Sequence, residues 1–147
     1  MSAKRLDPLR QRAEQREEAL AQELARRVQA HQQQAQRLDD LERFRGEYAQ
    51  PVPPGVALTP GLLQNRASFL ARIDEALGTQ KKHLASSEEA LAIERTRLLL
   101  ASRDRLVLEK LAASYRSAEQ RLQEQREQRV QDDLGARRHH DRREEKP

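Results

Sequence analysis

The stretch Pro-Val-Pro-Pro-Gly at residues 51–55 separates two long segments that contain few helix-breaking residues. Proline fixes its own φ angle, lacks a backbone N–H and pushes the preceding residue out of the helical region. The stretch therefore predicts a bend between two helices. Aromatic residues are rare, and three of the four in the chain lie just before or after this bend: Phe44, Tyr48 and Phe69. This clustering indicates a contact point at the bend.

The composition argues against a globular core. Charged residues make up 35% of the 147-residue chain and aromatic residues 3%, which is typical of long helices and coiled coils. A disordered chain would have a similar composition, but the charges are balanced, with 28 basic and 24 acidic residues, and the leucines recur at fixed intervals. Cysteine is absent, which excludes disulfides and thiolate metal sites.

Start and stop signals give the helix boundaries. Asp7-Pro8 predicts a helix start, because Asp favours the N-cap and Pro the first turn, and Thr59-Pro60 repeats this signal. Gly135 is interpreted as a helix stop. The chain is therefore predicted to form a single domain over residues 1–147, with a first helix over about 8–49, a loop over 50–60, a second helix over about 61–135 and a disordered basic tail over 136–147.

Leucines recur every seven residues in the second helix, which predicts a left-handed coiled coil. The repeat consists of Leu63, Leu70, Leu77, Leu84, Leu91 and Leu98, with companion positions at Ile73, Gln80, Ser87, Glu94 and Ala101. After Leu98 we expect the phase to slip into a second register formed by Leu108, Leu111, Tyr115, Ala118 and Leu122.

The short connection between the helices predicts an all-α fold, an antiparallel two-helix coiled-coil hairpin with a longer second helix. If the first helix pairs with residues 62–102, residues 104–134 extend beyond it without a partner. An apolar stripe on an unpaired helix needs something to cover it.

Each helix carries a second stripe near the bend, beside the stripe that faces its partner. On the first helix it consists of Arg37, Leu41, Phe44 and Tyr48, and on the second helix of Phe69, Ile73, Ala76 and Gln80. These residues either close the thin end of the hairpin or form an exposed patch for another protein.

Two motifs flank the bend: Leu41-x-x-Phe44-x-x-Glu47-Tyr48 before a glycine-containing loop, and Asn65-Arg66-x-x-Phe69-x-x-x-Ile73 after it. With the length and layout of the chain, they resemble the FliJ family of flagellar type III export proteins; the YscO-type injectisome stalk proteins are the close alternative. The resemblance implies an antiparallel coiled coil, similar to the stalk of the rotary ATPase gamma subunit. It also implies work with the hexameric export ATPase, docking onto the cytosolic domain of the export-gate protein FlhA, and handling of empty export chaperones.

The resemblance assigns roles to residues by position. The face for the export gate falls on Arg37, Leu41, Phe44, Tyr48, Phe69, Ile73, Ala76 and Gln80. The end that holds both termini is expected to enter the ATPase ring, with Arg5, Arg10, Arg12, Arg16, Arg121, Arg126 and Arg129 as candidate contacts. The alternative for these arginines is a solvated face with weak intrahelical Arg–Glu pairs.

No enzyme signature or cofactor motif is found, so we expect a non-enzymatic protein without a cofactor. The net charge of +4 is modest and the segment before the leucine repeat is a broken loop, so a DNA-binding zipper and a nucleic-acid partner are not expected. Neither a membrane span nor a secretory signal is found, so we expect a cytoplasmic protein, peripheral to the inner membrane at the export apparatus. The rival hypothesis is a structural coiled coil that homodimerises through Leu63–Leu98, whereas a stalk would be a monomer when free.

Overall fold

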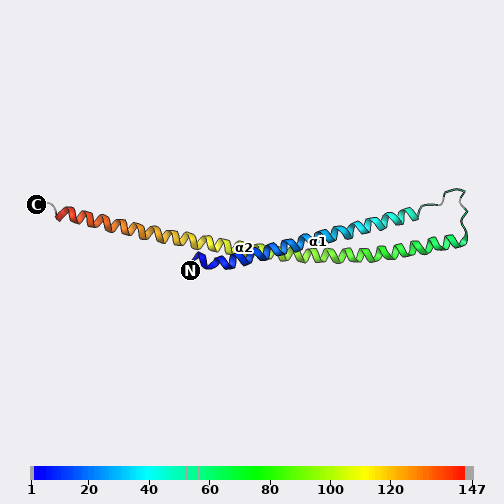
Figure 1. Ribbon diagram of the computed structural model, residues 1–147, viewed down its shortest axis with the longest axis horizontal. Helices are drawn as coiled ribbons and strands as arrows, with labels where there is room; N and C mark the ends of the chain where they lie inside the picture. The colour runs from blue at the N-terminus through cyan, green and yellow to red at the C-terminus, as the bar shows by residue number, and fades with distance from the viewer. Residues whose placement is uncertain (1, 52, 56, 145–147) are drawn as a thin grey trace. The chain divides into compact units, whose positions relative to one another are not determined.

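The computed structural model of the protein describes residues 2–51, 53–55 and 57–144. Its elements are a 3-10 turn, η1 (Ala3–Leu6), and two long helices, α1 (Asp7–Tyr48) and α2 (Pro60–Glu144) (Figure 1). No strand occurs among these described residues. The predicted all-α, two-helix hairpin with a longer second helix is therefore confirmed. Residues 52 and 56 of the predicted loop and 145–147 of the predicted tail lie outside the described part.

Side-chain caps define the helix starts. The Ser2 hydroxyl accepts a hydrogen bond from the backbone N–H of Lys4, at 3.1 Å, and so caps η1. The Thr59 hydroxyl accepts one from the N–H of Leu62, at 3.2 Å, directly before the first residue of α2. Such caps satisfy N–H groups that have no partner within the helix.

The end of α2 differs from the prediction of a stop at Gly135 and a disordered tail from residue 136. The helix continues through Gly135 to Glu144. A single glycine in a helix costs only about 1 kcal/mol, and mostly good helix formers follow it. His140 Nε2 and Glu144 Oε1, one turn apart, lie at 3.0 Å and support the last turn.

Contacts within the chain group its residues into two units. We call them the bend unit, Glu18–Leu100, and the terminal unit, Met1–Glu17 with Ala101–Pro147. The boundary on α2 follows the last leucine of the repeat.

In the bend unit, α1 and α2 run antiparallel and pack along a seam with steps of three and four residues. Ile73, Leu77 and Leu91 of α2 are buried there. Half-buried apolar residues line the rest of the seam: Leu20, Leu24, Val28, Ala35, Leu38 and Leu41 from α1, and Leu70, Leu84 and Leu98 from α2. This alternation is the knobs-into-holes spacing of a coiled coil.

Polar pairs occupy the companion positions of this seam. Gln80 Nε2 donates to the backbone oxygen and to Oε1 of Gln34, at 2.9 and 2.6 Å. One heptad further on, Ser87 Oγ lies 3.1 Å from His31 Nδ1. Because polar groups in a seam are satisfied in only one alignment, these pairs favour one register of α1 against α2.

Glu94 is the next companion residue and is only 3% exposed. Its Oε1 accepts a hydrogen bond from Arg97 at 3.1 Å and lies 3.7 Å from Arg27 Nε of α1. Its Oε2 is buried without a hydrogen-bond partner. The seam thus contains a carboxylate that is only partly compensated.

In the terminal unit the predicted phase slip after Leu98 is wrong. The heptad continues, with Ala101, Leu108 and Tyr115 in the companion positions and Arg105 and Ala112 in the positions that leucine held before. After Leu98 the large apolar residues occupy the companion position of the heptad instead of the position that leucine held before. The repeat itself is unbroken, but this change looks like a phase slip in the sequence. Leu111, Ala118 and Leu122 of the expected second register are exposed.

The paired length of α2 is also greater than predicted. The backbone N–H of Ala3 donates to Glu119 Oε1 at 2.9 Å, so the first segment covers α2 as far as Glu119. Ala3 and Leu6 of η1 are buried and extend the seam beyond the start of α1. The unpartnered part of α2 is therefore 120–144, where every residue is exposed, rather than 104–134.

Candidate functional site

A pair of aromatic rings lies at the bend. The ring centroids of Tyr48, near the end of α1, and Phe69, in α2, are 4.5 Å apart and the rings are tilted by 45°. Tyr48 is 46% exposed, Phe69 42% and Phe44, one turn before Tyr48, 54%. Tilted ring pairs at this distance attract each other, but here the rings remain largely open to solvent.

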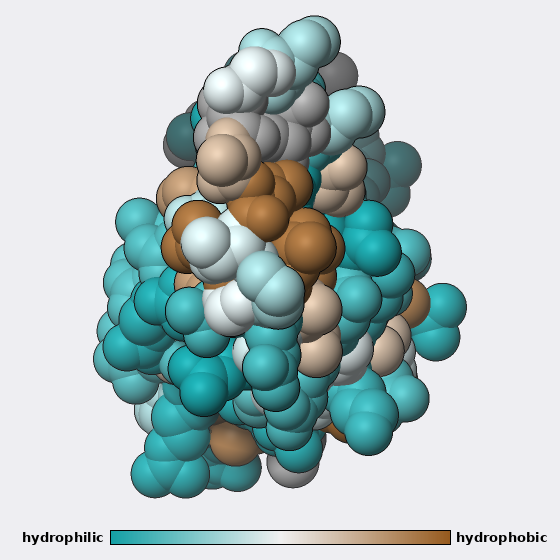
Figure 2. All heavy atoms as spheres, turned by 90° about the vertical axis from the view of Figure 1, so that its right-hand side faces the viewer, coloured by the Kyte–Doolittle hydropathy of each residue, from teal (hydrophilic) through white to brown (hydrophobic). Residues whose placement is uncertain are grey.

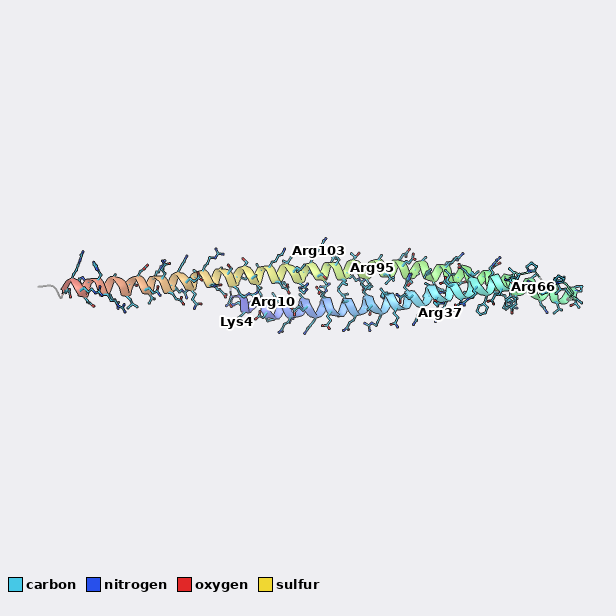
Figure 3. The ribbon with its side chains drawn as sticks, turned by 90° about the horizontal axis from the view of Figure 1, so that it is seen from above. Lys4, Arg10, Arg37, Arg66, Arg95 and Arg103 are labelled. Atoms are coloured by element: carbon cyan, nitrogen blue, oxygen red, sulfur yellow. The ribbon has the colours of Figure 1, made fainter. Side chains whose placement is uncertain are left out.

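Arg66 holds this end of α1 in place. Its guanidinium donates to the backbone oxygen of Tyr48 through Nε at 3.0 Å and through Nη2 at 2.5 Å, and it also donates to the backbone oxygen of Gln50. The last carbonyls of a helix lack partners and carry partial negative charge, so a guanidinium satisfies both needs. Arg66 lies beside the bend in Figure 3.

The rings border a groove of about 680 Å³. Figure 2, which faces the bend end, shows apolar atoms gathered there on an otherwise hydrophilic surface. The groove combines rings, prolines and leucines with a few polar groups. It is lined by Glu47, Tyr48, Gln50, Pro51, Pro53, Leu58, Leu62, Asn65, Arg66 and Phe69.

The structure separates the eight residues predicted for the export-gate face. Arg37, Phe44, Tyr48 and Phe69 are exposed, and Figure 3 shows Arg37 on α1; Leu41 and Ala76 are half-buried. Ile73 and Gln80 do not lie on a side face: Ile73 is 7% exposed in the seam and Gln80 bonds Gln34 across it. The reason is that both occupy companion heptad positions, which the seam requires.

An ion pair closes the flank of the bend next to the seam. Arg45 Nε of α1 donates to Asp74 Oδ1 of α2 at 2.5 Å, and this hydrogen bond raises the pKa of Arg45. Both side chains are about half exposed, so solvent screens the pair and it contributes little stability.

All seven arginines predicted for the ATPase ring belong to the terminal unit. Arg10 is half-buried, lies 3.4 Å from Asp7 Oδ1, and has a buried Nε without a partner, so it faces the seam. The other six are exposed: Arg5, Arg12 and Arg16 on the first segment and Arg121, Arg126 and Arg129 on the extension of α2.

Arg12 and Arg16 border a second groove, of about 440 Å³. We call it the terminal groove, and it is lined by Arg12, Ala13, Arg16, Ala101, Asp104, Val107 and Leu108. The sequence pattern identified these arginines only as positive charges and did not predict a groove beside them. Two small residues, Ala13 of α1 and Ala101 of α2, are part of its lining.

A charged cluster beside this groove fixes the pairing of the terminal unit. Arg105 donates through Nε to Glu17 Oε2 at 2.7 Å and through Nη1 to Glu109 Oε1 at 2.9 Å. The hydrogen bond from Arg105, together with one from Ser102, holds the pKa of Glu17 below its ordinary value. Sequence reasoning missed Arg105; its place seven residues after Leu98, in the leucine column, was the available signal.

Within the described residues, no three His, Asp or Glu side chains are placed to hold a metal ion. No described helix has a stretch long and apolar enough to cross a membrane.

Comparison with known proteins gives one match. The family model described as "Flagellar FliJ protein" matches residues 1–144. No curated protein and no solved structure matches the chain.

Proposed function

Because this chain belongs to the FliJ family of flagellar export proteins, we propose that it couples two parts of the export apparatus. Its terminal end enters the export ATPase ring, and its bend docks onto the cytosolic domain of the export-gate protein FlhA. The chain acts through binding, without catalysis or a cofactor, in the cytoplasm beside the inner membrane.

The observation that carries this proposal is the exposure of three rings near the bend, two of which, Tyr48 and Phe69, line its groove. Phe44, Tyr48 and Phe69 are 54, 46 and 42% exposed in a chain that contains only one other aromatic residue. Aromatic residues dominate the binding energy of many interfaces, because they bury a large area with few rotatable bonds. Rings held in place by Arg66 lose little entropy when a partner covers them.

For the gate contact we propose Phe44, Tyr48 and Phe69 as the central residues, with Arg37, Leu41 and Ala76 around them. Ile73 and Gln80 support this surface from the seam, where they hold α1 against α2. The same surface would receive export chaperones, so gate and chaperones would compete for it.

For the ring contact we propose Arg5, Arg12, Arg16, Arg121, Arg126 and Arg129, all exposed in the terminal unit. Positive side chains on a slender helical end are drawn toward an acidic opening and pair with carboxylates inside it. Arg10 is left out of the set, because it faces the seam.

The test is binding of the purified FlhA cytosolic domain by the double variant Phe44→Ala/Phe69→Ala, measured by titration calorimetry. Removal of two central rings should weaken binding at least thirtyfold, on the order of 1–2 kcal/mol per ring. The matched control is Leu99→Ala/Leu122→Ala, which removes two exposed apolar side chains elsewhere. Unchanged binding of the ring variant, with helicity intact by circular dichroism, rejects the gate assignment.

Two alternatives remain candidates with less support. The injectisome stalk would have the same hairpin, and the family match favours the flagellar system. The homodimeric coiled coil would use Leu63–Leu98, yet Leu77 and Leu91 of that repeat are already buried against α1. Sedimentation equilibrium separates these readings, since a stable dimer at micromolar concentration favours the homodimer.

A further inference from the structure

The terminal groove has the features of a docking site for a third helix. Its floor is formed by Ala13, Ala101 and Leu108, and the small alanines let another backbone approach closely. Val107 on its wall is 63% exposed, more than any other large apolar residue described in the structure. Exposed apolar side chains beside a groove of this kind commonly mark an interface.

Exposed apolar residues continue both walls beyond the groove. Leu111 lies one turn after Val107 on the same edge of α2, and Leu9 lies one turn before Arg12 on the corresponding edge of α1; both are exposed. The apolar strip is thus longer than one side chain. Its direction follows the helices, which suits a helical occupant better than a small molecule.

The groove is bordered by two positive side chains and one negative side chain, and none of them is paired within the part of the chain that the structure describes. Arg12 and Arg16 stand one turn apart on the α1 wall, and Asp104 stands on the α2 wall; none of the three makes an ion pair or hydrogen bond among the described residues. By contrast, Arg105, Glu17 and Glu109 beside the groove are fully paired. The two unpaired guanidiniums are therefore free to form ion pairs with two carboxylates of another molecule.

We infer that the terminal groove binds an acidic amphipathic helix of another protein. The carboxylates of that helix stand at positions i and i+4, which matches the spacing of about 6 Å between Arg12 and Arg16 along α1. Its apolar edge lies on Val107, Leu108 and Leu111. Nucleic acid fits worse, because the apolar wall gains nothing from a polyanion. The inference goes beyond the proposed function, since it requires neither the ATPase nor FlhA.

The experiment uses the full chain and a fluorescein-labelled 18-residue helical peptide with a leucine edge and two glutamates at i and i+4. A second probe has lysines in place of these glutamates. Fluorescence anisotropy should show saturable binding of the glutamate probe. Arg12→Glu/Arg16→Glu should weaken it at least tenfold and strengthen binding of the lysine probe, because two ion pairs become repulsive for one probe and attractive for the other.

Of the two probes, Val107→Asp should weaken binding of the one with glutamates, since it places a negative charge on the apolar wall. Arg95→Glu, a change of the same charge at an exposed residue of α2 (Figure 3), should leave both unchanged. Circular dichroism verifies that each variant folds. The inference is overturned if neither probe binds, if Val107→Asp has no effect, or if duplex DNA or anionic phosphatidylglycerol vesicles bind more tightly than the glutamate probe. Binding of the ATPase by the unsubstituted chain is measured separately, so absence of ring binding with intact probe binding would count against the proposed function alone.

Discussion

In the bend unit, the usual distribution of side chains is reversed, because polar residues lie in the seam and aromatic rings lie on the outer surface. The seam contains the half-buried Gln80 and Ser87 and the buried Glu94, while Phe44 and Phe69 stay exposed beside the bend. A fold that needed its rings for stability would have placed them inside. The difference indicates that leucines stabilise the hairpin and polar pairs set its register, and it supports the proposal that the rings contact other molecules.

The largest effect should come from a leucine of the seam. Leu91→Ala removes a buried side chain and leaves a cavity, so the free energy of unfolding should fall by about 2–3 kcal/mol. Phe44→Ala removes a larger side chain from the exposed surface and should change it by less than about 0.5 kcal/mol. Urea unfolding followed by circular dichroism measures both. Equal losses in the two variants would contradict the comparison.

The polar side of the comparison is tested at Glu94. Because this carboxylate is buried with one unpartnered oxygen, Glu94→Leu should stabilise the folded chain by about 1–2 kcal/mol. It should also weaken the preference for the hairpin, since a homodimer of α2 would no longer place two buried carboxylates opposite each other. Glu89→Leu, at an exposed position of α2, is the control. Analytical ultracentrifugation should detect a dimer only for Glu94→Leu. If this variant stays strictly monomeric, Glu94 lowers the stability of the fold without helping to select the hairpin.

Arg66 links the two regions, and its loss should have a smaller effect. Arg66→Ala leaves the carbonyls of Tyr48 and Gln50 without this donor, which should cost about 1 kcal/mol, mostly in the last turn of α1. Amide hydrogen exchange should speed up at Ala49, whose N–H bonds the carbonyl of Arg45. Arg72→Ala should leave exchange there unaltered. If exchange at Ala49 is the same in both variants, Arg66 does not anchor the helix end.

The smallest effect concerns pH. The hydrogen bond from Arg105 depresses the pKa of Glu17 in the folded chain, so the pair stabilises the fold above the unfolded pKa of the carboxyl. This contribution is lost as the pH falls through the folded pKa. Glu17→Gln should therefore reduce the difference in stability between pH 7 and pH 3, measured by urea unfolding. Glu14→Gln serves as the exposed control, and an equal reduction there would show that the pairing with Arg105 has no role.

The backbone signals and the leucine spacing were sufficient to predict the two helices, the bend and the bend-unit seam. Local rules apply there, because breakers, caps and heptads act within a few residues. The extent of pairing could not be predicted, since it depends on where Arg66 and Glu119 meet the first segment. The end of α2 was missed because one glycine is a weak stop without a cap or a following proline.

The candidate site was predictable in part. Proximity to the bend singled out Phe44, Tyr48 and Phe69; all three rings are exposed, and those of Tyr48 and Phe69 are in contact, whereas their role in binding stays a prediction. Helical periodicity alone could not decide that Ile73 and Gln80 face α1, because the seam and its flank differ by only a small rotation about the helix axis. The terminal groove is lined by residues from distant parts of the sequence, 12–16 and 101–108, and no local pattern marks such a combination.

The extension of α2 beyond Glu119 has a consequence for handling the chain. Residues 120–144 form a helix in which every side chain is exposed, so this segment lacks the packing from which most helices in proteins gain their stability. Trypsin would therefore reach its arginines during brief openings and trim the chain back toward the junction at Glu119. Beyond that point the paired segment should resist digestion, leaving a shortened core that still folds.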